Sequence, residues 1–183
     1  MMAPSPIATA WIAILLLACL TLPCTALESK VNTVSEKTLS VDLGPSFEIN
    51  RSALNTSDNG IASQDFLINN TASAGSAFIS IMSVYDGVLG KMSPSSLSEL
   101  FLIGGMSAVE ARGDKETGNW TAVSALGKNL TVHTMSTKDE RIQTIGGSYD
   151  MAVWDLDRST YAVLVSLLDR DNTTQIIKTL AVS

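Results

Sequence analysis

The stretch from residue 161 to residue 168 constrains the fold of this chain more than any other part of the sequence. Its β-forming side chains are apolar on both faces, because Tyr161 and Val163 alternate with Ala162 and Leu164. A strand with one face in water alternates apolar and polar residues, whereas a strand covered on both faces is apolar throughout. We therefore expect this segment to be a central strand, with packed layers on both sides of one sheet.

Several other segments alternate or are rich in β-forming residues. They predict strands at residues 39–43, 47–49, 65–68, 77–85, 120–125, 130–135 and 151–156. Gly127 and the pair Gly146–Gly147 stand between such segments and predict turns.

The sequence predicts a helix in the middle of the chain. Ser93 is a suitable N-cap residue, and Pro94 suits the first helical position. Apolar side chains then recur three and four residues apart on one face, at Leu97, Leu100 and Phe101. We expect Gly104–Gly105 to end this helix.

A second, short helix is expected near residue 180. Residues 169–171 predict a turn, and Asn172 or Thr173 predicts the cap of a helix that carries Ile176, Ile177 and Leu180. The resulting order of strands, helix, antiparallel strands and helix is the α+β pattern. We expect one α+β domain at residues 38–183, with a central, mainly antiparallel sheet, one mid-chain helix and one C-terminal helix.

This order of elements resembles the PsbP-like fold, an α/β/α sandwich with a central antiparallel sheet. The segments that carry the resemblance are residues 46–49 and the strand, turn and helix of residues 161–182. The resemblance implies a small extracytoplasmic accessory or binding protein, and it implies no particular site residue. The chain also looks like small secreted archaeal proteins in its composition.

The first 26 residues have the features of a secretory signal peptide. Residues 7–22 are apolar or neutral, Pro23 ends the run, and Cys24 and Ala26 supply small residues before a cleavage site. An uncleaved membrane anchor is the alternative, although a span needs about 20 apolar residues; lipidation at Cys19 is a third. Residues 27–37 predict a flexible spacer. We expect a secreted or cell-surface location.

A second feature favours export. Six of the nine asparagines begin an Asn-x-Ser/Thr sequon without proline, namely Asn50, Asn55, Asn69, Asn119, Asn129 and Asn172. These positions predict exposed, glycosylated loops or strand edges. Both cysteines, Cys19 and Cys24, lie within the signal peptide, so the domain has to be held by its core without disulfides.

Charge and motifs exclude several classes of function. The chain has 12 Lys and Arg against 18 Asp and Glu, a net charge of −6. This disfavours nucleic acid and anionic membrane surfaces as partners, which leaves membrane attachment only through an uncleaved N-terminal segment. His-Glu-x-x-His, Gly-x-Ser-x-Gly, Gly-x-Gly-x-x-Gly and P-loop motifs are missing from the sequence. We predict no catalytic residue, cofactor or metal site.

One histidine and two pairs of aspartates are the remaining candidates for a catalytic or metal site. His133 is the only histidine, so a Ser-His-acid triad would have to use it, but we expect a solvent-facing strand residue. The pairs Asp155/Asp157 and Asp169/Asp171 have oxygen ligands suited to calcium, but aspartates at turns usually bond their own backbone.

Trp120 and Trp154 are the aromatic candidates, and Trp120, inside a sequon, is the better candidate for an exposed binding aromatic. The favoured function is a non-enzymatic binding, adhesion or accessory module whose partner is an extracytoplasmic protein or glycan. The alternatives are a hydrolase that uses carboxylates or His133, and a carrier of a small apolar ligand.

Overall fold

The computed structural model describes residues 35–57, 60–85 and 88–183. The expected signal peptide and most of the expected spacer lie outside these residues.

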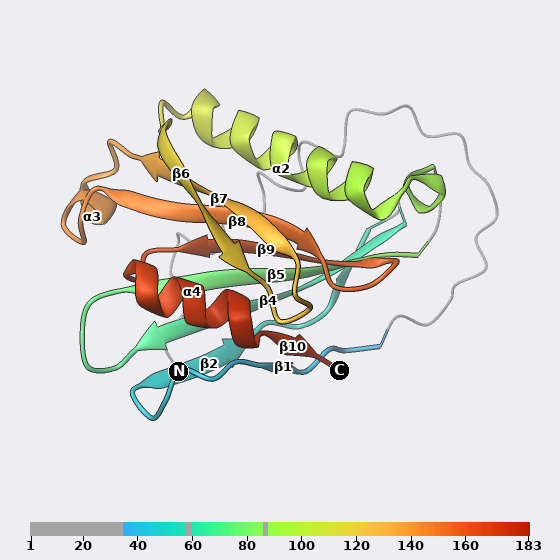
Figure 1. Ribbon diagram of the computed structural model, residues 1–183, viewed down its shortest axis with the longest axis horizontal. Helices are drawn as coiled ribbons and strands as arrows, with labels where there is room; N and C mark the ends of the chain where they lie inside the picture. The colour runs from blue at the N-terminus through green and yellow to red at the C-terminus, as the bar shows by residue number, and fades with distance from the viewer. Residues whose placement is uncertain (1–34, 58–59, 86–87) are drawn as a thin grey trace.

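One antiparallel sheet of eight strands forms the body of the molecule (Figure 1). In spatial order its strands are β2 (Phe47–Arg51), β4 (Ile61–Asn70), β5 (Ser76–Val84), β9 (Thr160–Ser166), β8 (Ser148–Asp155), β7 (Asn129–Ser136) and β6 (Lys115–Val123), with β3 (Asn55–Thr56) also paired to β4. Together with the helices described below, this sheet confirms the expected α+β fold.

The strand β9 is the middle strand of the sheet, as its apolar pattern predicted. It pairs with β5 on one side and β8 on the other, and all seven of its residues are buried. Tyr161 and Val163 belong to the apolar cluster on one face, whereas Ala162 and Leu164 belong to the cluster on the opposite face. Each face of the sheet is therefore covered by its own packed apolar layer.

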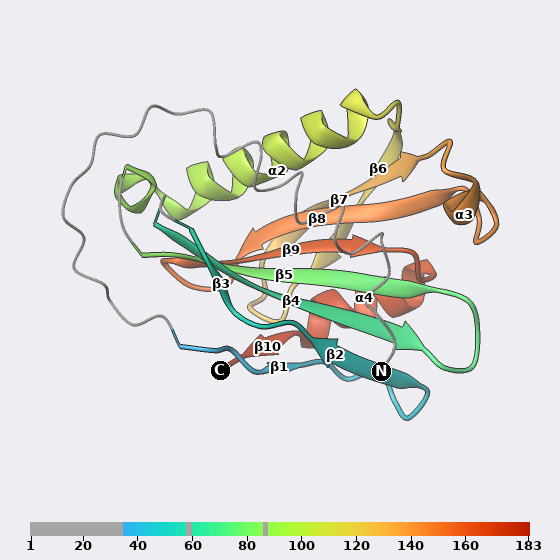
Figure 2. The ribbon, with the colours of Figure 1, turned by 180° about the vertical axis from the view of Figure 1, so that it is seen from behind.

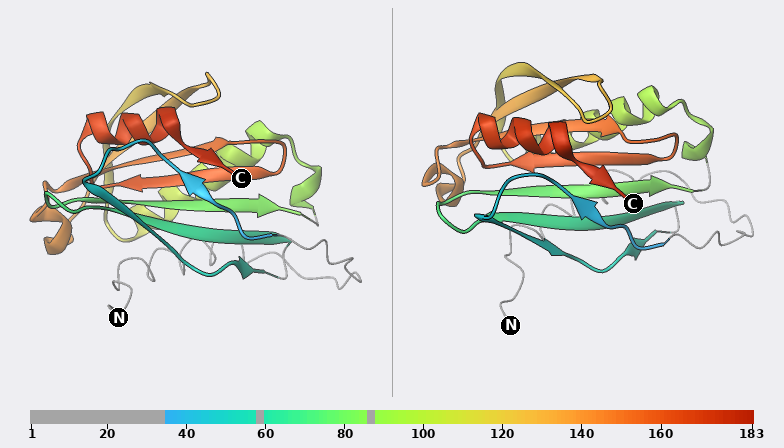
Figure 3. Two further views of the ribbon diagram at one scale, coloured as in Figure 1. Left: turned by 90° about the horizontal axis from the view of Figure 1, so that it is seen from below. Right: turned by 60° about the horizontal axis from the view of Figure 1, so that its bottom comes forward.

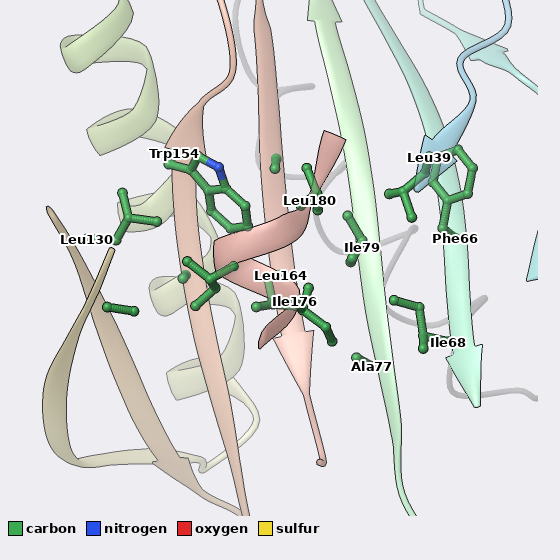
Figure 4. Close-up of a cluster of buried hydrophobic side chains, with 14 of the residues drawn as sticks. Leu39, Phe66, Ile68, Ala77, Ile79, Leu130, Trp154, Leu164, Ile176 and Leu180 are labelled. Atoms are coloured by element: carbon green, nitrogen blue, oxygen red, sulfur yellow. The ribbon is translucent and has the colours of Figure 1, made fainter. Parts of the chain in front are cut away.

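One face, the α4 face, is covered by α4 (Arg170–Thr179) and by a short pair of strands, β1 (Leu39–Ser40) and β10 (Ala181–Val182) (Figures 1 and 3). Its core brings Leu164 and Trp154 of the sheet together with Ile176 of α4 (Figure 4). Leu164 and Ile176 have no exposed surface. The expected packing of β9 against the final helix is confirmed.

The opposite face, the α2 face, is covered by α2 (Pro94–Ala111), which lies across β8 and β9 (Figure 2). Ser93 is its N-cap, as expected, and accepts a hydrogen bond from the Ser96 N–H at 3.2 Å. The prediction that Gly104–Gly105 ends the helix is wrong. Gly105 is buried against β8 within the helix, and the chain leaves the helix at Arg112 and Gly113, whose φ of 93° suits glycine.

The start of α4 also differs from the expectation. Its N-cap is Asp169, whose side chain accepts a hydrogen bond from the Asn172 N–H at 2.8 Å. Asn172 and Thr173 therefore lie inside the first turn instead of capping it, because the carboxylate three residues before Asn172 already binds the free backbone N–H group.

The strand boundaries differ most near the start of the domain. The alternation at residues 39–43 yields only the two residues of β1, because its partner β10 is also two residues long and α4 ends just before it. The Asp42 N–H donates to Thr179 Oγ1 of α4 at 2.9 Å. Val41 and Leu43 nevertheless pack against the core of the α4 face. The expected short strand at residues 65–68 is the longer β4. A 3₁₀ turn, η1 (Leu89–Lys91), and a short helix, α3 (Glu140–Gln143), complete the described elements.

Candidate functional sites

The His133 ring is within hydrogen-bonding distance of Glu116 on the α2 face, beside the edge strand β6. Its Nδ1 lies 2.8 Å from Glu116 Oε1, and the histidine side chain is 17% exposed. Asn119 lies directly opposite His133, and Glu116 stands three residues earlier, which would put it on the other face of a regular strand. A bulge between Glu116 and Gly118 returns Glu116 to the face of His133.

This pair has part of the geometry of a catalytic dyad, because a carboxylate fixes the orientation of the imidazole. Within the described residues, however, no serine or threonine hydroxyl is hydrogen-bonded to the other ring nitrogen. The histidine is also less exposed than the expected solvent-facing position, since Glu116 covers one edge of its ring. Glu116 therefore orients the His133 imidazole, but within the described residues no hydroxyl nucleophile is hydrogen-bonded to it.

Three of the four aspartates in the two Asp pairs, Asp155, Asp157 and Asp169, have structural partners. Asp157 Oδ1 accepts hydrogen bonds from the backbone N–H groups of Ser159 at 2.7 Å and Thr160 at 2.8 Å. Burial alone would raise the pKa of Asp157, but these hydrogen bonds outweigh it and lower that pKa. Asp155 forms an ion pair with Lys128, and Asp169 caps α4.

Among the described residues, no group of three or more His, Cys, Asp and Glu side chains is placed to hold a metal ion. Nor is any described helix long and apolar enough to cross a membrane.

A buried polar network joins the end of α2 to β8, and no local pattern in the sequence indicates it. The Tyr149 hydroxyl donates a hydrogen bond to Asp114 Oδ2 at 2.8 Å, and Arg112 lies 3.4 Å from the same oxygen. Burial, followed by the hydrogen bond to Asp114, raises the pKa of Tyr149 well above its usual range. The tyrosine therefore stays protonated and acts as a hydrogen-bond donor that anchors this loop.

A second buried carboxyl group belongs to Asp65 of β4, and no pattern in the sequence indicates that it is buried. Its residue is 5% exposed, and burial raises its pKa, although a hydrogen bond with Ser80 lowers it in part. Oδ2 of Asp65 has no hydrogen-bond partner among the described residues. Ser80, directly opposite Asp65 on β5, is equally buried, so the two side chains form a buried polar pair within the sheet.

Trp120 is half-buried and packs against the core of the α4 face. The Arg170 guanidinium lies 4.9 Å above the centre of its ring, a distance at which a cation and an aromatic face attract each other. Trp120 thus fastens β6 to the start of α4, and only part of it is accessible. Trp154 is 2% exposed and fills the same core.

The six sequons fall at different degrees of exposure. Asn50, Asn55, Asn119 and Asn129 are exposed, whereas Asn69 and Asn172 are half-buried. The Asn172 side chain donates a hydrogen bond to Asp169 Oδ2 at 2.8 Å, so its amide takes part in the α4 cap.

The outer side of α2 exposes two large apolar residues. Leu100 is 42% exposed and Ile103 is 54% exposed, and their spacing of three residues places them on one side of the helix. We call these two residues the α2 patch. The helix contains no lysine or arginine, and its only charges are Glu99 and Glu110. The sequence did not predict this patch, because Leu100 was expected on the buried face.

No protein family, curated protein or solved structure matches this chain. The resemblance to PsbP-like domains stays a prediction.

Proposed function

We propose that the protein is an extracytoplasmic binding module that docks another protein through the α2 patch. The observation that carries the proposal is the pair of exposed apolar side chains, Leu100 and Ile103, on a helix that lies outermost on its side of the sheet. Exposed large apolar groups that are close together are typical of protein contact sites.

The distribution of sequons supports the same surface. Residues 71–118, which include all of α2, contain no asparagine and therefore no acceptor for an N-glycan. The helix itself therefore carries no N-glycan, which leaves its outer side open to a protein partner.

The chemistry of the patch indicates the kind of partner. A net charge of −6 and the absence of basic residues in α2 disfavour nucleic acid and anionic lipid. Sugar recognition usually relies on exposed aromatic rings, and the two tryptophans of the domain are both partly or fully packed in the core. An apolar surface of another protein fits the patch best.

A photo-crosslinking amino acid tests the proposal at single-residue resolution. It is placed at Ile103 in the full chain, in the organism that produces it, and at Ile49 as a matched control. Ile49 is 39% exposed but lies on β2. We expect one discrete protein adduct from position 103 and none from position 49. Equal labelling from both positions, or no adduct at all, would overturn the proposal.

The second candidate is a hydrolase that uses the pair of Glu116 and His133, and it is favoured by the 2.8 Å contact between them. A panel of ester, amide and phosphoester substrates separates the two candidates. Turnover that is lost in His133→Gln but kept in Leu100→Gln would establish the hydrolase and remove the main argument for a module without catalysis.

A further inference from the structure

The edge strands of the sheet carry a risk that the central strands do not. Among the described strands, β2 and β6 form the two ends of the spatial order. An edge strand presents unpaired backbone N–H and C=O groups, which can pair with another chain and start aggregation. The domain has no disulfide to hold the edge strands in place, so partial unfolding would free further backbone groups for such pairing.

The strand β6 is the longer of the two edge strands. It is nine residues long, and seven of its residues are classed as exposed. Its only charges, Lys115 and Glu116, stand at the start next to the bulge, and residues 118–123 are uncharged and free of proline. A six-residue stretch of this composition, with Trp, Thr and Val, is typical of aggregation-prone segments.

The sequons gather on these edges. Asn119 lies in β6, Asn50 in β2 and Asn55 in β3, while Asn129 faces Val123 of β6 and Asn69 faces Glu48 of β2. The three central strands β5, β9 and β8 contain no sequon. The four exposed sequon asparagines all belong to the edge strands or to their immediate neighbours, whereas Asn69 and Asn172 are half-buried.

We propose that N-glycans on the edge strands, above all on Asn119, shield both ends of the sheet from pairing with other chains. The proposal rests on the extracytoplasmic location proposed above, because the sugar is transferred outside the cytoplasm. The Asn119 amide nitrogen attacks the anomeric carbon of a lipid-phosphate-linked oligosaccharide. The bond from that carbon to the phosphate oxygen breaks, and the amide nitrogen loses one proton.

The position of Asn119 suits this role. Its residue is exposed, and it lies on the α2 face one residue before Trp120, at the beginning of the uncharged stretch. A flexible oligosaccharide attached there sweeps over the open edge of β6 and hinders the approach of a second strand. The charges and bulge that protect other edges are confined to the start of β6, so the glycan supplies the missing protection.

Two variants remove this glycan by different routes. Asn119→Gln removes the acceptor, and Thr121→Ala removes the hydroxyl of the sequon while it keeps Asn119. Thr121→Ala also lowers the β-propensity of the edge strand, which by itself would slow aggregation. Thr174→Ala, which destroys the sequon of Asn172 and leaves its amide in the α4 cap, is the matched control.

All four proteins are secreted from a host that performs N-glycosylation, and their intact masses and rates of aggregation on heating are measured. We expect a glycan at Asn119, and we expect both Asn119→Gln and Thr121→Ala to aggregate several-fold faster than the wild type and Thr174→Ala. The melting temperature of Asn119→Gln should stay close to that of the wild type, so that its faster aggregation reports the loss of the glycan and not a loss of stability. Produced in a host without N-glycosylation, wild type and Asn119→Gln should aggregate equally fast.

The outcomes separate the two proposals. Retention of the chain inside the cell, without any glycan, would overturn both the location and the edge role. A secreted protein that carries glycans elsewhere but none at Asn119 would overturn the edge role alone. The edge role alone would also be overturned if both variants lost the glycan but aggregated as slowly as the wild type.

Discussion

Gly105 of α2 lies directly over Met151 of β8, so close that a β-carbon at position 105 would stand 2.2 Å from Met151 Cε. This contact explains why the helix continues through its two glycines. The missing side chain lets the helix approach the sheet, and the end of the Met151 side chain fills the space that remains.

Substitution at Gly105 should therefore depend on the size of the new side chain. Gly105→Ala should change the free energy of unfolding by less than about 1 kcal/mol, since the end of Met151 can move and alanine favours the helix. Gly105→Val should cost about 1–3 kcal/mol through overpacking, and Met151→Ala should recover part of this cost. Urea unfolding measures all three. Gly118→Val, at a site with no neighbouring atom within 4 Å, is the control; equal costs at both positions would contradict the packing.

Leu164 should be among the most sensitive positions of the core. It is fully buried in the middle strand, and replacing a buried leucine by alanine typically costs about 2–5 kcal/mol. Ile49→Ala, on the exposed edge, and His133→Ala, whose contact with Glu116 lies near the surface, should each cost at most about 1 kcal/mol. Thermal melts compare the three variants. If Leu164→Ala left the melting temperature unchanged and His133→Ala lowered it strongly, this assignment of core and surface would be wrong.

The N-cap of α2 should contribute measurably to stability. Ser93 Oγ accepts the Ser96 N–H, and Ser93→Ala should lower the free energy of unfolding by about 1 kcal/mol. Ser107→Ala, at an exposed position inside the same helix, should be neutral or slightly stabilising because alanine favours helices. Denaturant unfolding of the two variants checks this, and equal effects would show that the cap contributes nothing.

Asp139 should titrate at an unusually low pH. Hydrogen bonds from the side chain and backbone of Arg141 lower the pKa of Asp139 to about 2. Because the folded pKa is lower than the unfolded one, its stabilising effect is present at neutral pH and is lost as the pH falls through about 2. Carbon-detected NMR of the carboxyl group measures the midpoint, which Arg141→Gln should raise. A midpoint at the ordinary value for aspartate would contradict the contact.

The sequence predicted the layers of the fold better than its junctions. The pattern of β9 depends only on the alternation of neighbouring side chains, so a central strand between two layers could be recognised without the structure. The end of α2 could not, because Gly104, Gly105 and Gly113 are all chemically able to stop a helix. Only tertiary packing against Met151 decides that Gly113 adopts the left-handed backbone.

The candidate sites were still harder to foresee. The pair of Glu116 and His133 depends on a bulge that moves one strand by a residue. Gly118 stands beside this bulge, but an isolated glycine in a strand does not by itself tell which side chains the bulge brings together. Tyr149 and Asp114 are far apart in the chain and meet only through the sheet. Leu100, in contrast, follows the apolar spacing of the helix but lies at the border of the buried stripe, where spacing alone does not decide exposure.

The central claim is that the α2 patch docks a protein partner. Its most direct test is whether unlabelled protein competes with the photo-crosslink at position 103. Unlabelled wild-type protein in excess should abolish the adduct, whereas the folded double variant Leu100→Gln/Ile103→Gln in the same excess should leave most of it. Glutamine keeps the helix propensity while it removes the apolar surface, so circular dichroism of the variant should be unchanged. If the double variant competes as well as the wild type, the α2 patch is not the docking surface.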